Sequence, residues 1–210
     1  MTVNSTSTNS INAVAILTQA ATAFQARIGN NRPNPKAVTR ALLEAEKTAK
    51  QEHRQYPLES LLGHWRLCFT TSGKVNLRQG MASGKSGFYV PQLVTAQISF
   101  TRPTSSDDDN SDKIEIGNQI QLGSLLFRLT GQAQYLERKN LLAFDFTHMQ
   151  FVLFGKTVYR GAFPGQKTQT EDFLTQPISK LAFFTFFLIT KDFIAARGRG
   201  GGVALWVRQP

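Results

Sequence analysis

The chain has 210 residues, of which 41% are hydrophobic and 18% are charged, and this composition predicts one main folded domain and excludes a chain that is disordered throughout. The formal net charge of +10 raises nucleic acid or an anionic membrane as a partner. Because the excess charge is spread along the chain and forms no single basic stripe, we expect no nucleic-acid partner. The one cysteine, Cys68, excludes an internal disulfide and is expected to be a packing residue.

The N-terminal ten residues differ in composition from the rest of the chain. Residues 1–10 are rich in Ser, Thr and Asn, and we expect them to form a disordered tail. They lack the basic segment of a secretory signal and the arginines of a transit peptide. We therefore expect the protein to stay in the compartment where it is made.

Residues 11–60 show the periodicity of two amphipathic helices. Apolar residues recur every three or four positions from Ile11 to Ile28, which places them on one stripe of a helix. Asn34 and Pro35 then fit the cap and the first position of a second helix. We expect this helical hairpin to pack on the following domain; the alternative is a coiled coil that binds a protein partner. The second helix carries the apolar stripe Val38, Leu42, Ala45 and Ala49.

From Leu61 onward the apolar period changes to two, which is typical of β-strands. In the first of these segments, alternation places Trp65, Leu67 and Phe69 on one face and Cys68 on the other. Regularly spaced short strands predict an antiparallel barrel or sandwich, so the fold class is expected to be mainly β, with residues 61–210 as a β-barrel domain. The same alternation recurs in residues 94–100, 114–122, 125–129, 142–146 and 203–207.

The last strand of a closed barrel lies beside the first. Residues 193–208 read as a hairpin whose turn is built from arginine and glycine, and its second strand ends at Arg208. We expect Arg208 to lie over the Trp65 ring and to close one end of the barrel. The alternative is a surface arginine and an unrelated core tryptophan.

Phenylalanine is abundant in the predicted strands: the chain has 16 Phe but only 4 Tyr. These rings either fill a core or line a cavity for a hydrocarbon ligand, and the scarcity of hydroxyl groups favours a cavity. The candidate ligand-binding residues are Trp65, Leu67, Phe69, Phe100, Phe127, Phe144, Phe146 and Arg208.

No pattern in the sequence indicates catalysis. The three histidines lack zinc-ligand spacing, and Gly84-Lys85-Ser86 lacks the upstream glycine of a phosphate-binding loop. Asp145 and His148 are three residues apart, so they share a face only if their strand is interrupted. We expect no enzyme activity, no cofactor and no metal.

Two segments resemble the plastid lipid-associated (fibrillin) family. Residues 61–72, LLGHWRLCFTTS, are similar to the opening strand of that family, and residues 193–208, FIAARGRGGGVALWVR, are similar to its closing signature. The resemblance implies a lipocalin-like barrel that binds apolar isoprenoids such as carotenoids or quinones at thylakoid membranes or plastoglobules. Phe69 stands where the family often has tyrosine, and the sequence lacks a plastid-targeting extension, which favours a cyanobacterial-type member.

We therefore expect a non-catalytic lipid-binding protein of the cytoplasm, peripherally associated with thylakoid membrane or lipid droplets, with a role in photoprotection or lipid storage. In a plant-type cell the compartment would be the plastid. Lys74, Arg78 and Lys85, in the glycine- and lysine-rich loop 71–87, are expected to contact anionic lipid at about 1 kcal/mol each. The alternative is an adaptor that holds an isoprenoid-synthesising or photosynthetic enzyme and has no ligand of its own.

Overall fold

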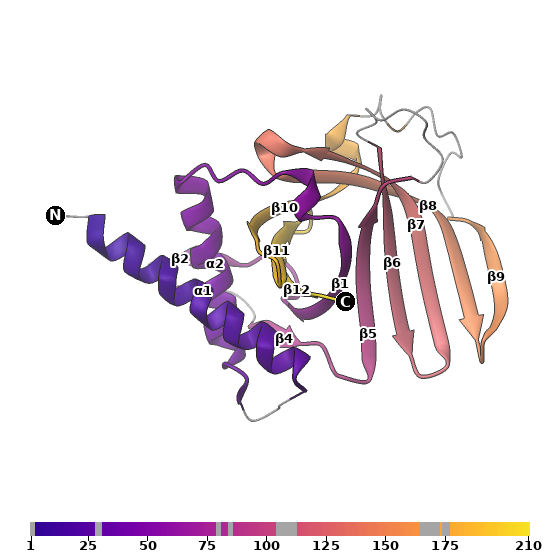
Figure 1. Cartoon of the computed structure of the whole chain (residues 1–210), viewed down its shortest axis with the longest axis horizontal. Coiled ribbons are helices and arrows are strands. Elements are labelled where there is room, and N and C mark those ends of the chain that lie inside the picture. Colours follow the sequence, from indigo (N-terminus) through magenta and orange to yellow (C-terminus); the bar gives the residue numbers. More distant parts are fainter. Residues whose placement is uncertain are drawn as a thin grey trace.

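The computed structural model describes residues 3–27, 31–78, 81–83, 86–103, 113–163, 173 and 177–210. Within them a helical pair lies beside one large antiparallel sheet (Figure 1). The helices are α1 (Val3–Gln25) and α2 (Pro35–Gln51), and the short 3-10 helices are η2 (Leu58–Ser60), η3 (Glu137–Lys139) and η5 (Ile178–Lys180). The strands are β1 (Gly63–Thr70), β2 (Asn76–Arg78), β3 (Met81–Ser83), β4 (Phe88–Tyr89), β5 (Val94–Thr101), β6 (Lys113–Leu122), β7 (Leu125–Leu136), β8 (Leu141–Leu153), β9 (Lys156–Ala162), β10 (Ala182–Ile189), β11 (Phe193–Gly198) and β12 (Val203–Arg208).

The sheet closes on itself. Its strand order is β10-β11-β12-β1-β5-β6-β7-β8-β9, and β8 also pairs with β10, so the strands from β10 to β8 form a ring that leaves β9 outside. As predicted, the first and last strands of the barrel are neighbours, with Trp65 of β1 opposite Arg208 of β12. The mainly β, barrel-like fold with an N-terminal helical pair is confirmed.

Helix α1 begins earlier than the sequence predicted. It starts at Val3, so the expected disordered tail over residues 1–10 is wrong for the part that the structure describes. Relative to Ala, each Ser, Thr or Asn disfavours a helix by only about 0.5 kcal/mol. A helix that is nucleated on the apolar stripe can therefore extend through these residues. Ile11 is 72% exposed, because the N-terminal half of α1 projects away from the sheet (Figure 1). The predicted helix end at Gly29 and Asn30 lies outside the described residues.

Helix α2 begins as its sequence predicts. Pro35 is its first residue, and the Asn34 side chain accepts a hydrogen bond from the Lys36 backbone N–H at 2.9 Å. The stripe from Val38 to Ala49 is buried. This cap and this stripe fix where the helix starts and which side it presents to the barrel.

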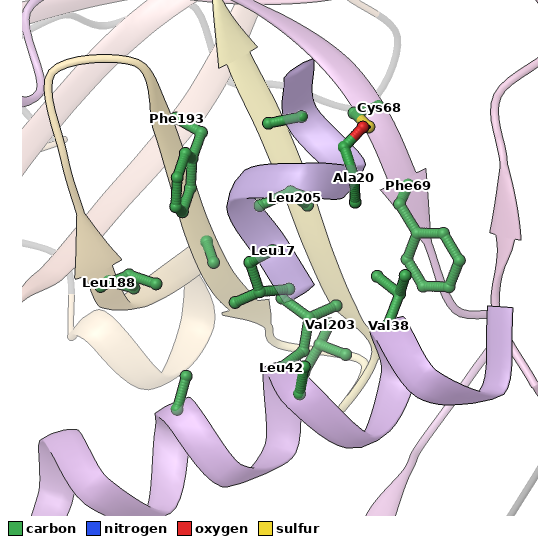
Figure 2. Packing of buried hydrophobic residues seen from close by; sticks show 14 of the residues in the cluster. Leu17, Ala20, Val38, Leu42, Cys68, Phe69, Leu188, Phe193, Val203 and Leu205 are labelled. Atoms are coloured by element: carbon green, nitrogen blue, oxygen red, sulfur yellow. The ribbon is translucent and has the colours of Figure 1, made fainter. Parts of the chain in front are cut away.

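The helical pair covers the outer face of β1, β12, β11 and β10 (Figure 2). Cys68 belongs to this cluster, and its Sγ lies 3.8 Å from the Ala20 carbonyl oxygen. Cys68 is fully buried, which confirms a packing role, and burial raises the pKa of its thiol to about 12. The α2 stripe and the described α1 stripe, except for Ile11, are therefore used in packing. Besides Ala20, Cys68 and Phe69, Figure 2 labels the cluster members Leu17, Val38, Leu42, Leu188, Phe193, Val203 and Leu205.

A bulge in β1 changes the direction of its side chains. The register with β12 shifts between Leu67 and Phe69, so Leu67 lies opposite Trp206 and Phe69 lies opposite Leu205. Phe69 consequently faces the helices, as Figure 2 shows, and its ring contacts Tyr89 at 5.2 Å between centroids. The prediction that Phe69 shares a face with Trp65 and Leu67 is wrong, because a bulge adds one residue and reverses the alternation beyond it.

The barrel has two unlike ends. At the end near residues 58–62, which we call the closed end, β1 pairs with β5 from Gly63 to Arg66 and β10 pairs with β8. Toward the opposite end, the open end, β1 leaves β5 and pairs with β4, while the lower half of β8 pairs with β9 instead of β10. The strands β5 to β9 therefore continue at the open end without an opposing strand pairing across to them.

Of the two loops predicted from the sequence, one contains strands and the other is not described by the structure. The loop expected over residues 71–87 contains the small hairpin β2–β3. The acidic turn expected over residues 104–112 lies outside the described residues.

An ion pair fastens the helical pair to the barrel. The Arg197 guanidinium of β11 donates to both Glu46 carboxylate oxygens, with 2.8 Å between Nε and Oε1, and also to the Val75 and Gly201 carbonyl oxygens. Lys50 adds a more exposed contact to the same carboxylate at 2.8 Å. Burial raises the pKa of Glu46, but the hydrogen bonds and charges of Arg197 and Lys50 outweigh burial and leave the pKa below its ordinary value of 4.5.

We predict that Glu46→Gln lowers the free energy of unfolding by about 3 kcal/mol at pH 7, because it leaves a mostly buried arginine without its counter-ion. Lys50→Gln is the control, and removing this exposed partner is expected to cost about 0.5 kcal/mol or less. Urea unfolding at a series of pH values measures both. Because the folded pKa of Glu46 is depressed, its contribution is present above the unfolded pKa and is lost as pH falls through the lower folded pKa. Equal losses for the two variants would contradict this assignment.

Candidate functional site

Arg208 locks the closed end of the barrel. Its guanidinium carbon lies 3.9 Å from the centroid of the Trp65 ring, which confirms the predicted contact. The same group donates hydrogen bonds to the carbonyl oxygens of Lys191 at 2.7 Å, Leu62 at 3.0 Å and Ser60 at 3.2 Å. Burial lowers the pKa of Arg208 below its ordinary value. With Trp65 Nε1 donating to the Leu61 carbonyl at 2.7 Å, these bonds hold the chain segment that covers this end.

A second network holds the same cover from the other side. Asn140, in a left-handed conformation with φ 47°, accepts from the Tyr56 backbone N–H at 3.0 Å and donates to the Arg54 carbonyl at 2.6 Å. The Tyr135 hydroxyl donates to the Tyr56 carbonyl at 3.1 Å. Burial raises the pKa of Tyr135, so it stays a neutral donor. The linker between α2 and β1 is therefore fixed across the closed end.

The interior next to the closed end is packed with side chains. Phe100 and Phe186 meet edge to face at 6.0 Å, and Phe144 and Phe184 stack at 5.1 Å. Phe184 also contacts the Trp206 ring at 5.6 Å. Among the predicted ligand-binding residues, this part of the barrel contains Trp65, Phe100, Phe144 and Arg208.

Toward the open end the same inner face is less covered. Leu67, Phe127 and Phe146 are each partly exposed. Phe127 lies opposite Phe151 of β8, with 4.6 Å between ring centroids, and opposite Ile120 of β6. Of the three, Leu67 and Phe146 also pack against the buried cluster beside the closed end, whereas Phe127 is not part of that cluster. By strand register, the inner face here also includes Val94, Ala96, Asn118, Leu122, Leu125, Leu129, Met149, Leu153 and Tyr159.

The open end carries a row of exposed large apolar side chains, which we call the apolar lip. It consists of Leu93, Leu122, Leu125, Leu153 and Phe154, with exposed fractions of 84%, 54%, 43%, 41% and 78%. Strand pairing places Leu122 opposite Leu125 and Leu125 opposite Leu153. Leu93 directly precedes Val94, which lies opposite Leu122. Figure 1 shows the three chain reversals along the same edge of the sheet, with the β6–β7 and β8–β9 turns farther from the helices than the β4–β5 connection.

The lip was not predicted from the sequence, although the sequence contains a signal for it. The turns between β6 and β7 and between β8 and β9 read Leu-Gly-Ser-Leu and Leu-Phe-Gly-Lys, with large apolar residues at or beside positions where turns usually carry polar ones. Exposed turn positions do not form a core. Apolar residues there indicate contact with something outside the chain.

Phe154 occupies a backbone conformation that suits glycine. Its φ is 49° and that of Gly155 is 74°, so both central residues of the β8–β9 turn are left-handed, as in a type I′ turn. Such a conformation costs a residue with a side chain about 1–3 kcal/mol. The Phe154 N–H donates to the Ser124 carbonyl at 3.1 Å, which ties the β8–β9 turn to the β6–β7 turn.

The charge around the lip has one sign. Residues 86–103, 117–136 and 146–163 contain no Asp or Glu, while Arg128, Lys156 and Arg160 lie on β7 and β9. The open end therefore combines apolar turns with basic strands.

The predicted membrane-contact loop is only partly described. Lys74 is exposed beside Gly201 in the β11–β12 turn. Arg78 ends β2, but its side chain is not among those described, and Lys85 lies outside the described residues.

The outer face holds a polar hollow, lined in part by Thr130, Gln132, Thr147 and His148. A bulge at Thr147 of β8 interrupts the strand and places Asp145 and His148 on the same outer face, where His148 Nδ1 lies 2.9 Å from Thr147 Oγ1. Gly131 permits the bulge, because a Cβ there would overlap the Asp145 carbonyl oxygen. In the described part of the chain no three His, Cys, Asp or Glu residues are grouped to hold a metal.

Comparisons with known proteins identify no family for the chain. No model of a known protein family matches it, and no curated protein matches it in sequence. The resemblance in residues 61–72 and 193–208 therefore remains a hypothesis. Among the described residues, no helix has the length and apolar character needed to cross a membrane.

We predict that Arg208→Met lowers the free energy of unfolding by about 2–3 kcal/mol, since it removes three hydrogen bonds from a charged donor and the contact with Trp65. Arg138→Met is the matched control, because Arg138 is exposed in η3. Urea unfolding followed by tryptophan fluorescence measures both. If the two variants unfold alike, Arg208 does not lock the closed end.

Proposed function

We propose that the barrel binds an apolar isoprenoid or lipid, such as a carotenoid or a quinone, without catalysis, on its inner face near the open end. The observation that carries the proposal is the change of exposure along one continuous apolar face. Beside the closed end this face is buried among aromatic rings, and beside the open end the same strands keep it partly uncovered. An uncovered apolar face of this kind gains free energy when a hydrocarbon covers it, at about 25 cal/mol per Å².

The chemistry of the inner face suits an apolar molecule with one polar group. Most side chains toward the open end are aliphatic or phenylalanine, and Asn118 of β6 lies among them, opposite Leu129 and Ile98. An amide can donate to a carbonyl or accept from a hydroxyl. A ring with an oxygen substituent and a long isoprenoid chain therefore matches this face, with Asn118 as the polar anchor.

The family resemblance supports the same proposal. The two similar segments, 61–72 and 193–208, become β1 and the β11–β12 hairpin, which lie side by side and supply Trp65 and Arg208 to the closed end. On this basis we propose membership of the plastid lipid-associated family, association with thylakoid membrane or lipid droplets, and a role in photoprotection or lipid storage.

We predict that a short-chain plastoquinone quenches the fluorescence of Trp206, which faces the interior opposite Leu67. Phe127→Asp is expected to weaken this binding more than about tenfold, because a carboxylate on the inner face must lose water when the ligand covers it. Thr130→Asp is the matched control, since Thr130 is an exposed residue of the same strand on the outer face. A Trp65→Phe background removes the other tryptophan from the signal.

Equal quenching in Phe127→Asp and Thr130→Asp would place the ligand elsewhere. No quenching in the wild type, repeated with β-carotene in place of the quinone, would contradict ligand binding. That result would favour the adaptor alternative, in which the chain holds an enzyme and carries no ligand.

A further inference from the structure

The apolar lip makes no contribution to the core of the protein. Its five side chains are between 41% and 84% exposed, and they come from three neighbouring chain reversals rather than from one irregular loop. A monomer has no reason to gather such residues at one edge, since each would be more favourably hydrated if polar. The lip therefore has the properties of a contact surface.

Phe154 strengthens this argument. A glycine at position 154 would adopt φ 49° without strain, whereas phenylalanine pays a conformational cost and buries little surface in return. An exposed aromatic ring held at the tip of a hairpin against the backbone preference points to a role outside the fold.

The charges around the lip indicate which kind of partner it contacts. Arg128, Lys156 and Arg160 lie on the strands that carry it, and the surrounding residues 117–136 and 146–163 contain no acidic side chain. The apolar side chains of the lip match the acyl chains of an anionic lipid layer, and the nearby basic side chains match its headgroups.

We infer that the apolar lip inserts into the interfacial region of an anionic membrane, so that the open end of the barrel faces the lipid. Leu93, Leu122 and Phe154 enter the apolar layer first, and Lys156 and Arg160 contact the headgroups. The inference rests on the proposed function, because it gives an apolar ligand a path between the bilayer and the inner face that avoids water. Its test requires no ligand.

The test is co-sedimentation with vesicles of phosphatidylglycerol and phosphatidylcholine, compared with vesicles of phosphatidylcholine alone. The wild type is expected to bind the anionic vesicles more tightly and to lose affinity as salt is raised. The double variant Leu93→Ser/Phe154→Gly removes two insertion points and is expected to weaken binding at least about tenfold. Lys156→Gln/Arg160→Gln is expected to weaken binding to anionic vesicles alone.

Two controls distinguish membrane insertion from nonspecific adsorption to vesicles and from loss of folding. Ile11→Ser removes a 72% exposed side chain from α1, and vesicle binding is expected to be unchanged. Phe154→Gly alone relieves backbone strain, so its Tm is expected to rise by about 2–4 °C while its vesicle binding falls. A loss of stability cannot produce that pair of opposite changes.

The outcomes distinguish this inference from the proposed function. Unchanged vesicle binding in Leu93→Ser/Phe154→Gly, or absent binding in the wild type, overturns the lip as a membrane anchor even if Trp206 quenching by plastoquinone persists. Vesicle binding through the lip without quinone quenching leaves the anchor standing and removes the ligand. If the lip variant instead abolishes self-association in analytical ultracentrifugation, the lip is an interface between copies of the chain and the membrane inference fails.

Discussion

The separation of β1 from β5 beyond Arg66 is the constraint from which the open end follows. Up to that point the two strands pair and the ring of the barrel is complete. Beyond it, the bulge between Leu67 and Phe69 turns β1 toward β4 and toward the helices that cover its outer face. Each edge of a strand can pair with only one neighbouring strand at a given position. Because β1 pairs with β4 beyond Arg66, the part of β5 toward the open end has no strand paired to that edge. The inner face of β5 to β9 stays uncovered as a result.

The two ends of the barrel use the same side-chain chemistry for different purposes. At the closed end, Trp65 and Arg208 hold the covering segment through ring stacking and hydrogen bonds to three backbone carbonyls, and most of the aromatic rings beneath are buried. At the open end, phenylalanine and leucine on the same strands remain partly exposed. What differs is the presence of opposing strands, since hydrophobicity alone does not determine whether a residue is core or binding surface.

Much of the architecture could be predicted from the sequence, because local patterns determine it. The Asn34–Pro35 helix start, the alternation in β5 to β8 and the pairing of the first and last strands follow from capping, period and closure. The face of Phe69 could not be predicted, since a bulge leaves no mark in the alternation before it. The candidate site was predicted in part: Leu67, Phe127 and Phe146 lie on the inner face and are partly exposed, whereas the grouping of Leu93 with Phe154 depends on three turns meeting in space.

The one-sided charge of the open end has a consequence for encounter kinetics. Glu59, Glu137 and Asp192 lie at the closed end among cations such as Arg138, Lys139 and Lys191, whereas among the described residues the turns and strand ends around the lip carry cations without acids. A negative surface therefore meets no repelling carboxylate when the lip approaches it. This advantage acts at short range, because ions limit the reach of the field to about 8 Å at physiological ionic strength.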